Sequence, residues 1–417
     1  MNKPTGAPRP RIWTLTFCNL IFISLASTSI VDALQAALPI YIDSLGRGAT
    51  LSGLLVTIFA GASIPLFLAS GPLVDRFGRR VIMFCGAVLF FIGVAMPLLL
   101  TSIRALLLAR VIQGCGFAVV NVASAAAASY ILPRERLGEG IGYYGLGQSL
   151  ALALGPTIGL GLINHSHGDP RMMWLTLSGI LLLVSIASFF CFCDRPNLAN
   201  ITPQKEHACV KRVESGHKVR EFFLLFFEPG ATWASLLIFL TVIGVSATIV
   251  FSGLYAQTRG FSSATAFFVF TALAMIGSRF SSGLFMDRYS PFVILVPTLG
   301  ALMIAFLMLA YAQTPLVFSL AGIPFGLGFG VVTPLLSSVA VKRSPHNRGG
   351  VANSMFYLSL NMSFGVGALI GGRVISVFGF RTAFLLATIT AILPLVIGYF
   401  VLSEKSTNQS AAPSVEA

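Results

Sequence analysis

Long apolar runs separated by short polar turns make up almost the whole chain. Each run has about twenty residues, which as an α-helix is long enough to cross the hydrocarbon core of a bilayer. The runs are continuous rather than alternating, which is typical of membrane helices and not of barrel strands. We therefore predict an all-α integral membrane protein with twelve transmembrane helices. The predicted helices begin near Ile12, Ser52, Val81, Ala105, Gly138, Met172, Ala231, Ala264, Phe292, Leu316, Gly350 and Thr382.

The turn residues repeat after 212 positions, since Asp75-Arg76 returns as Asp287-Arg288 (287 − 75 = 212). Further pairs at this offset are Gly48 and Gly260, Gly114 and Gly326, Gly116 and Gly328, Pro133 and Pro345, Arg136 and Arg348, and Gly138 and Gly350. Such a repeat predicts two pseudo-symmetric six-helix halves with a cavity at their interface. We place the N-terminal half at 1–193, a cytoplasmic linker with an amphipathic helix at 194–230, the C-terminal half at 231–403 and a disordered cytoplasmic tail at 404–417.

Composition supports a membrane protein, because 56% of the 417 residues are hydrophobic and only 10% are charged, against about 25% charged in soluble domains. The net charge of +13 follows from topology rather than from nucleic-acid binding. With the N-terminus inside, nineteen lysines and arginines fall on the inner side and five on the outer side, as the positive-inside rule requires. We expect a multi-pass protein of the plasma (cytoplasmic or inner) membrane, surrounded by lipid, with both termini cytoplasmic. The six cysteines match no zinc-ligand spacing, so no metal is expected.

The second and third runs are joined by the polar turn Gly71-Pro-Leu-Val-Asp75-Arg76-Phe-Gly78-Arg79-Arg80. This turn resembles the signature loop of the major facilitator superfamily, and with twelve helices in two halves the resemblance covers nearly the whole chain. The fourth run carries Arg110-x2-Gln113-Gly114, which is similar to a motif of the twelve-helix drug/proton antiporter branch. The fifth run reads Gly142-x8-Ala151-x3-Gly155-Pro156-x2-Gly159-Leu160, which is similar to the antiporter motif of that branch, with Ala151 and Leu160 replacing two glycines.

The resemblance implies a transporter rather than an enzyme. It implies proton-coupled efflux of a small organic molecule, such as a drug or a metabolite, by alternating access. We expect a monomer without a cofactor, because the proton gradient supplies the energy and the sequence has no phosphate-binding loop for ATP. Two alternatives remain open: a proton-coupled importer of a small metabolite, and a non-transporting membrane receptor.

Of the fourteen acidic residues, only Asp32 lies well inside a predicted span, and ionisable groups within membranes are functional by default. Arg110 in the fourth span lies at a similar depth, counted at about 1.5 Å per residue. A carboxylate near an arginine in low dielectric can switch between charged and protonated forms. We predict that Asp32 carries the proton and that Arg110 modulates it, with Glu139 as the next candidate. The alternatives are a static ion pair that fixes helix packing, or an aspartate exposed to the outer vestibule.

Three further sets of residues are predicted to take part in transport. The conformational latch comprises Gly71, Asp75, Arg76, Gly78, Arg79 and Arg80, with Asp287 and Arg288 as a weaker counterpart in the second half. For Arg79 and Arg80 a simple positive-inside anchor is the alternative. A hinge in the fifth span comprises Gly155, Pro156 and Gly159, because proline removes a helix hydrogen bond and small residues permit close packing. The substrate cavity is expected to be lined by Gln35, Gln113, Asn121, Tyr143, Tyr144, Gln148, Tyr255, Asn353, Tyr357 and Asn361.

Overall fold

The regular elements of the protein are helices wherever the structure describes the chain. The computed structural model describes residues 12–100, 102–133, 136–165, 169–191, 228–261, 264–286, 289–345 and 348–403. The predicted amphipathic helix of the linker and the tail from residue 404 lie outside the described residues.

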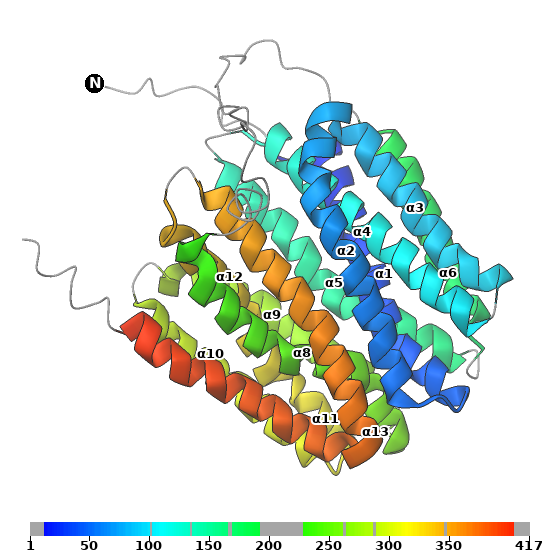
Figure 1. Cartoon of the computed structure of the whole chain (residues 1–417), viewed down its shortest axis with the longest axis vertical. Helices are drawn as coiled ribbons and strands as arrows, with labels where there is room; N and C mark the ends of the chain where they lie inside the picture. The colour runs from blue at the N-terminus through cyan, green and yellow to red at the C-terminus, as the bar shows by residue number, and fades with distance from the viewer. Residues whose placement is uncertain are drawn as a thin grey trace, which may run out of the picture. The chain divides into compact units, whose positions relative to one another are not determined.

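The described part of the first half forms six long helices, each beginning within four residues of a predicted span (Figure 1). Gly78 separates the second from the third with a left-handed φ of 87°, which a residue with a side chain rarely adopts. The helices are α1 (Leu15–Ser44), α2 (Gly48–Phe77), α3 (Arg79–Leu99), α4 (Ile103–Ile131), α5 (Leu137–His165) and α6 (Arg171–Phe189).

The second half begins with a short 3₁₀ helix and continues with long apolar helices. The elements are η2 (Pro229–Ala231), α8 (Thr232–Thr258), α9 (Thr265–Met286), α10 (Pro291–Ala310), α11 (Pro315–Leu320), α12 (Gly322–Lys342) and α13 (Gly349–Ser403). α11 and α12 together form one apolar segment. α13 contains two helices, because Gly379 has a φ of 82° and a ψ of 170°. In Figure 1 the α13 ribbon turns back on itself between its orange and red parts.

The predicted fold class is confirmed. Ten described segments are long and apolar enough to cross a membrane. One of them contains both helices of α13, and α9 has a shorter described apolar part, Thr265–Arg279. The chain is therefore an all-α multi-pass membrane protein, and its helices are consistent with the twelve predicted spans.

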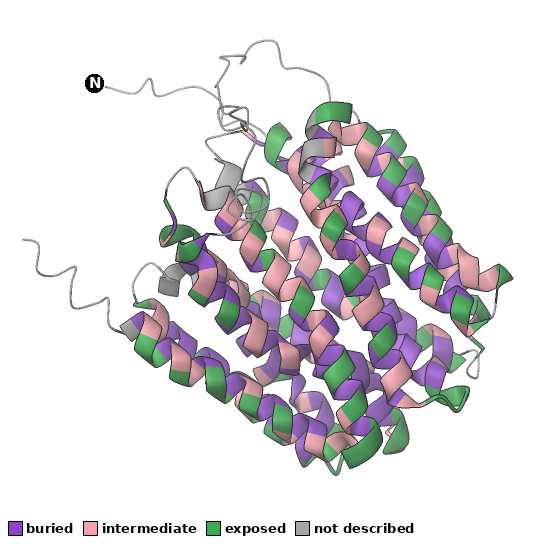
Figure 2. Ribbon diagram, in the orientation of Figure 1, coloured by how far each residue is buried: buried purple, intermediate pink, exposed green. Residues whose placement is uncertain are grey.

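Several helices bury one side and expose apolar residues on the other (Figure 2), whereas α8 is buried all round from Gly244 to Ala256. In α6, Leu177, Leu181 and Val184 are buried, whereas Leu175 and Leu182 are 60% and 49% exposed. The buried residues recur every three or four positions, which keeps them on one helix face. Exposed leucines are costly in water but not in a bilayer, where the lipid tails are equally apolar. The exposed apolar faces are the surfaces that the spans present to lipid.

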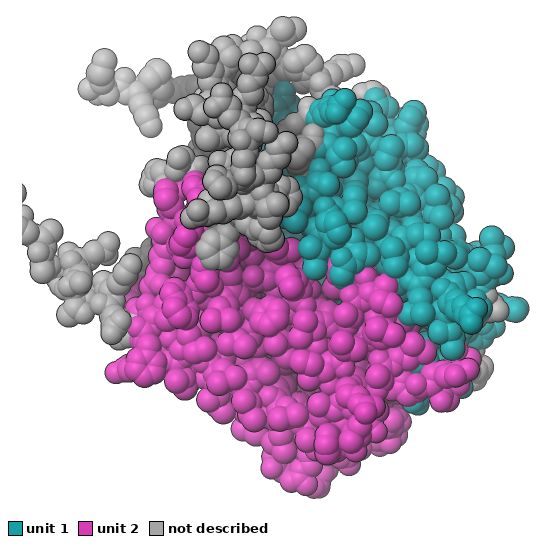
Figure 3. All heavy atoms as spheres, in the orientation of Figure 1, with its two compact units in different colours: residues 1–44, 61–194 teal, residues 45–60, 195–417 magenta. Residues whose placement is uncertain are grey.

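The chain divides into two compact units (Figure 3). Unit 1 comprises residues 1–44 and 61–194, and unit 2 comprises residues 45–60 and 195–417. The first half of α2 belongs to unit 2 because it packs on α13. Thr57 Oγ1 donates to the Gly365 carbonyl at 2.7 Å, and a Cβ on Gly53 would overlap the backbone of Ala368. This contact lies at the end of α2 opposite the turn at Gly78.

The turns that repeat in the sequence also repeat in the structure. Gly48 and Gly260 have nearly equal left-handed φ angles of 70° and 71°. In the two proline turns, the Arg136 N–H donates to the Pro133 carbonyl at 3.0 Å and the Arg348 N–H donates to the Pro345 carbonyl at 2.8 Å. The two halves therefore use the same local conformations at matched positions, as a duplicated unit would.

Close helix contacts at glycine repeat as well. A Cβ on Gly116 of α4 would overlap the backbone of Phe90 on α3. A Cβ on Gly328 of α12 would lie 2.6 Å from the Leu302 side chain on α10, and Leu302 stands 212 positions after Phe90. Without a hydrophobic driving force between helices in lipid, such small residues hold helices together by permitting close van der Waals contact.

Substitution of Gly116 tests the α3–α4 contact. We expect Gly116→Ala to destabilise the protein by about 1–3 kcal/mol, because the added methyl group has no free volume beside the Phe90 backbone. Thermal unfolding of the purified protein in detergent measures the effect. Gly179→Ala on α6 is the matched control, because its Cβ would meet no atom within 4 Å. An unchanged unfolding temperature for Gly116→Ala would contradict the contact.

Candidate functional site

The α1–α5 contact brings the predicted proton carrier against the predicted hinge. A Cβ on Gly155 would lie 2.5 Å from the Ser29 carbonyl oxygen and 2.7 Å from the Asp32 Cβ. One turn further along α5, a Cβ on Gly159 would lie 2.5 Å from the Ala33 carbonyl oxygen. The two glycines therefore let α5 rest directly on the turn of α1 that carries Asp32. Separate motifs of the sequence meet at this one place in unit 1.

The Asp32 side chain is half-buried in this contact. Among the described residues, its carboxylate has no hydrogen bond and no ion pair. An ionised carboxylate away from bulk water is costly unless water, a cation or a proton compensates its charge. The geometry thus gives Asp32 the property that a proton carrier needs, namely a charge that is not permanently neutralised by a neighbouring side chain.

Arg110 is fully buried and contacts Gln113. Its Nη1 donates to Gln113 Oε1 at 3.0 Å, and Gln113 Nε2 donates to the Gly93 carbonyl of α3 at 2.8 Å. Gly93 is required there, because a Cβ on it would lie 2.8 Å from the Gln113 backbone nitrogen. No ion pair joins Arg110 to Asp32 in the part of the chain that the structure describes. A static ion pair between Asp32 and Arg110, which was one of the alternatives, is therefore not found among the described residues.

Three polar residues of unit 1, Asp32, Arg110 and Gln113, have no polar equivalents in the second half. The residues 212 positions after Asp32, Arg110 and Gln113 are Gly244, Gly322 and Phe325. All three are packing residues, since a Cβ on Gly244 or Gly322 would overlap a neighbouring helix and Phe325 is fully buried. At these three positions the second half therefore has packing residues where the first half has polar groups.

Three of the predicted cavity residues form hydrogen bonds to neighbouring segments of the protein. Gln113 joins α3 to α4, and the Tyr144 hydroxyl pairs with Ser124 Oγ at 2.9 Å between α5 and α4. Tyr255 is 2% exposed, and its hydroxyl donates to the carbonyls of Leu309 and Ala312. The structure therefore places Gln113, Tyr144 and Tyr255 in packing positions.

Three other predicted cavity residues form a polar stripe along one face of α13. Asn353, Tyr357 and Asn361 follow one another at intervals of four residues and therefore share a helix face. Tyr357 is 46% exposed, and the guanidinium of Arg279 on α9 interacts with it electrostatically. Asn353 accepts a hydrogen bond from Ser337 of α12 at 3.1 Å. The stripe thus combines amide, phenol and guanidinium groups on one side of unit 2.

The remaining predicted cavity residues are scattered over unit 1. Gln35 on α1 is buried, and Asn121, Tyr143 and Gln148 are half-buried. The Tyr143 ring packs on Trp13, with 5.0 Å between the ring centroids. No described contact joins these side chains to one another, so the structure leaves their part in substrate binding as a prediction.

The latch turn ties the start of α3 to its neighbours in unit 1. The Arg79 guanidinium lies 3.8 Å from the Tyr130 ring centroid at the end of α4. Arg80 Nε donates to the Phe189 carbonyl at the end of α6, at 2.7 Å. These contacts give both arginines a structural role in addition to topology. The side chain of Asp75, and Asp287 and Arg288 altogether, lie outside the described residues.

Sequence reasoning missed an ion pair between a buried acid and a half-buried arginine at the start of unit 2's described helices. Glu228 is 3% exposed, and its Oε2 lies 3.1 Å from Arg348 Nε. Its other oxygen accepts a hydrogen bond from the Gly230 N–H at 3.4 Å. Arg348 belongs to the sequence repeat, and this was the only feature of the sequence that pointed to a structural role for it. Its acidic partner is 120 positions away along the chain, so only folding reveals it.

These features define a multi-pass helical membrane protein with a duplicated framework and an acidic site in one repeat. A family model described as Major Facilitator Superfamily matches residues 12–361 and 317–417. The chain belongs to this superfamily.

Sequence relatives and a solved structure agree with this assignment. An uncharacterized MFS-type transporter, MJ1560, of Methanocaldococcus jannaschii is 24% identical, covering 93% of this chain and 96% of the relative. The multi-drug resistance efflux pump PmrA of Streptococcus pneumoniae is 25% identical, covering 87% of this chain and 89% of the relative. The crystal structure of a mutant of the nucleoside transporter NupG has a TM-score of 0.73 at 13% identity, covering 91% of this chain and 98% of that one. At this identity the structural likeness shows the fold alone.

Removing the Gln113 amide tests whether this residue stabilises the fold or instead serves only to bind substrate. We expect Gln113→Leu to lower the free energy of unfolding by about 1–3 kcal/mol, because buried Arg110 and the Gly93 carbonyl each lose a partner. Urea or thermal unfolding in detergent measures this effect. The half-buried Gln148→Leu is the control, and a stability loss in Gln148→Leu equal to that in Gln113→Leu would contradict the prediction.

Adding one methyl group at Gly155 tests the α1–α5 contact. Gly155→Ala forces α1 away from α5 at Asp32, so we expect at least a tenfold loss of transport with the protein still present in the membrane. Gly161→Ala on the same helix is the control, because its Cβ would meet no atom within 4 Å. Both variants are compared by transport rate per amount of membrane-inserted protein. Equal activity of the two would show that the contact is not needed.

Proposed function

We propose that this chain is a secondary active transporter that exports a small organic molecule from the cytoplasm in exchange for protons. Membership of the superfamily supports transport. The resemblance of the α5 sequence to the antiporter motif supports export. The name of the Streptococcus pneumoniae relative, a multi-drug resistance efflux pump, agrees with that direction.

The observation that carries the proposal is the position of Asp32 on the α1–α5 contact. The carboxylate group begins at a Cβ that touches Gly155 of α5. A change in its charge therefore acts at a seam between two helices rather than on an isolated surface. Binding a proton removes the cost of a charge in the membrane, and losing the proton restores it. This couples the protonation of one residue to the packing of two helices.

In the proposed cycle, substrate enters from the cytoplasmic side while Asp32 is ionised, and the protein then opens outward. Protonation of Asp32 favours substrate release and return to the first state. A ligand or proton can drive such a change only by binding the two states with different affinity. We propose that the polar stripe of Asn353, Tyr357 and Asn361 contacts the substrate. With Arg110 and Arg279 within spans, the charge balance favours neutral, zwitterionic or anionic cargo over dications.

Proton release on substrate addition tests the proposal. Inside-out vesicles are acidified internally, a pH-sensitive dye reports the gradient, and candidate drugs and metabolites are added in turn. We expect a substrate to dissipate the gradient in the native protein, and Asp32→Asn to reduce that response at least tenfold. Asp43→Asn is the matched control, because Asp43 is an exposed acid at the end of the same helix.

Two outcomes would contradict the proposal. A full response in Asp32→Asn would place the proton site on another residue. Substrate uptake that requires protons to move in the same direction would make the protein an importer rather than an exporter.

A further inference from the structure

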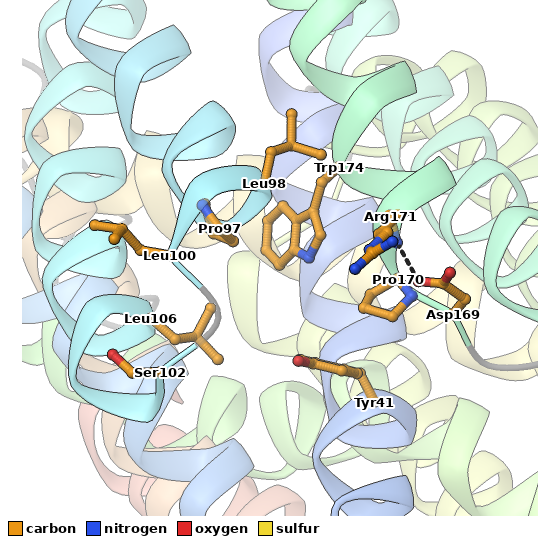
Figure 4. Close-up of a pocket in the computed structure, with 10 residues that line it drawn as sticks. All are labelled: Tyr41, Pro97, Leu98, Leu100, Ser102, Leu106, Asp169, Pro170, Arg171 and Trp174. Atoms are coloured by element: carbon orange, nitrogen blue, oxygen red, sulfur yellow. Dashed lines mark hydrogen bonds between the residues drawn. The ribbon is translucent and has the colours of Figure 1, made fainter.

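A small cavity opens at the end of unit 1 opposite the latch turn. It has a volume of about 140 Å³ and lies between the ends of α1, α3, α4 and α6 (Figure 4). The site of the proposed proton carrier is separate from it, since Asp32 does not line the cavity. The lining residues are Tyr41, Pro97, Leu98, Leu100, Ser102, Leu106, Asp169, Pro170, Arg171 and Trp174.

Trp174 forms the inner wall of this cavity. Its side chain is only 2% exposed, and Figure 4 shows the indole facing the space between Tyr41 and Pro97. The indole N–H can only donate a hydrogen bond, and it has no acceptor among the described residues. The nitrogen is not one of the buried atoms that lack a partner and can be reached from the cavity that Trp174 lines, so an acceptor on a ligand can bind it there.

Two more donors border the same space. The Tyr41 hydroxyl and the Arg171 side chain face it from α1 and α6 (Figure 4). No hydrogen bond or ion pair of either side chain is found within the described ranges. The donors of Trp174, Tyr41 and Arg171 together match an anionic oxygen group such as a phosphate or carboxylate.

An acidic group completes the polar wall. Asp169 Oδ1 accepts a hydrogen bond from the Arg171 backbone N–H at 2.9 Å, which holds the carboxylate at the start of α6. The carboxylate also interacts electrostatically with Tyr41. An acid beside three donors disfavours a simple anion and favours a ligand that carries both an anionic and a cationic group.

The opposite wall is apolar. Pro97, Leu98, Leu100 and Leu106 line it, and Leu100 is 50% exposed on the outer surface of the helices. The adjoining Leu99 is 86% exposed. Since this surface belongs to a membrane span, an acyl chain attached to the bound group has an apolar path out of the cavity.

The second half closes the corresponding place with aromatic rings. At an offset of 210, Asp169, Arg171 and Trp174 correspond to Gly379, Arg381 and Phe384. Phe384 has no N–H group, and its ring packs 5.2 Å from that of Tyr255. Arg381 lies 4.7 Å from the Tyr311 ring centroid. The cavity is therefore a feature of the first half and not a consequence of the shared fold.

We propose that this cavity binds a zwitterionic phosphoethanolamine group, either as the headgroup of a phospholipid or as a free molecule. Its phosphate accepts hydrogen bonds from Trp174, Tyr41 and Arg171, and its ammonium group lies against Asp169. The apolar wall holds the carbon atoms that follow the phosphate.

Tryptophan fluorescence tests the site in the full-length chain. The protein has three tryptophans, so a Trp13→Phe/Trp233→Phe variant leaves Trp174 as the reporter. The purified protein in detergent is titrated with short-chain phosphatidylethanolamine, free phosphoethanolamine and short-chain phosphatidylglycerol. We expect a saturable change in Trp174 emission with a phosphoethanolamine compound, weakened at least tenfold by Arg171→Gln and about threefold or more by Tyr41→Phe. Arg381→Gln is the matched control and should bind as the parent does.

The outcomes separate the sources of the ligand. Saturable binding of the lipid but not of free phosphoethanolamine supports the headgroup, and binding of both with similar affinity supports the free zwitterion. Absence of binding by either compound overturns the proposal. Phosphatidylglycerol that binds as tightly as phosphatidylethanolamine, with no effect of Asp169→Asn, overturns it too, because the site would then be a simple anion site. Tyr41→Phe removes one hydroxyl from a half-buried side chain, so the test does not depend on a variant that disturbs folding.

Discussion

Close approach of helices at glycine is the constraint on which the rest of the structure depends. In lipid, apolar side chains gain nothing by leaving the solvent, so helices associate through van der Waals contact and a few hydrogen bonds. Gly116 brings α4 onto α3, and Gly155 and Gly159 bring α5 onto α1. Each contact leaves no room for a methyl group. The positions of these glycines therefore decide which helices touch and which turn of each helix meets its partner.

The cost of charge in an apolar environment organises the polar groups on this framework. Buried Arg110 is held by Gln113, and buried Glu228 is paired with Arg348. Asp32 differs, because no side chain in the described parts of the chain donates a hydrogen bond to its carboxylate or forms an ion pair with it. Groups of the first kind stabilise one arrangement of helices. A group of the second kind can respond to a proton, which is why the proposed coupling rests on Asp32.

The two halves share a framework and differ in chemistry. The left-handed glycines at 48 and 260 have the same conformation in both halves. By contrast, Trp174 lines a cavity, whereas its counterpart Phe384 packs on Tyr255. Backbone geometry and close packing are thus retained by the duplication, while Asp32 and the indole of Trp174 have no counterparts of the same kind in the second half. Such asymmetry allows one half to bind or to titrate while the other supports it.

The sequence by itself determined the helices, the repeat and the family, because span length, turn glycines and the Gly71–Arg80 motif are local properties of the chain. The sequence also singles out Asp32, since a single acid in an apolar run is visible without a structure, and its role in proton transport stays a prediction. Only the tertiary structure showed that Gln113 and Tyr255 form hydrogen bonds to neighbouring segments, and that Trp174 lines a cavity. Helical periodicity shows that a residue shares a face with others, but the identity of the facing helix depends on contacts between distant segments.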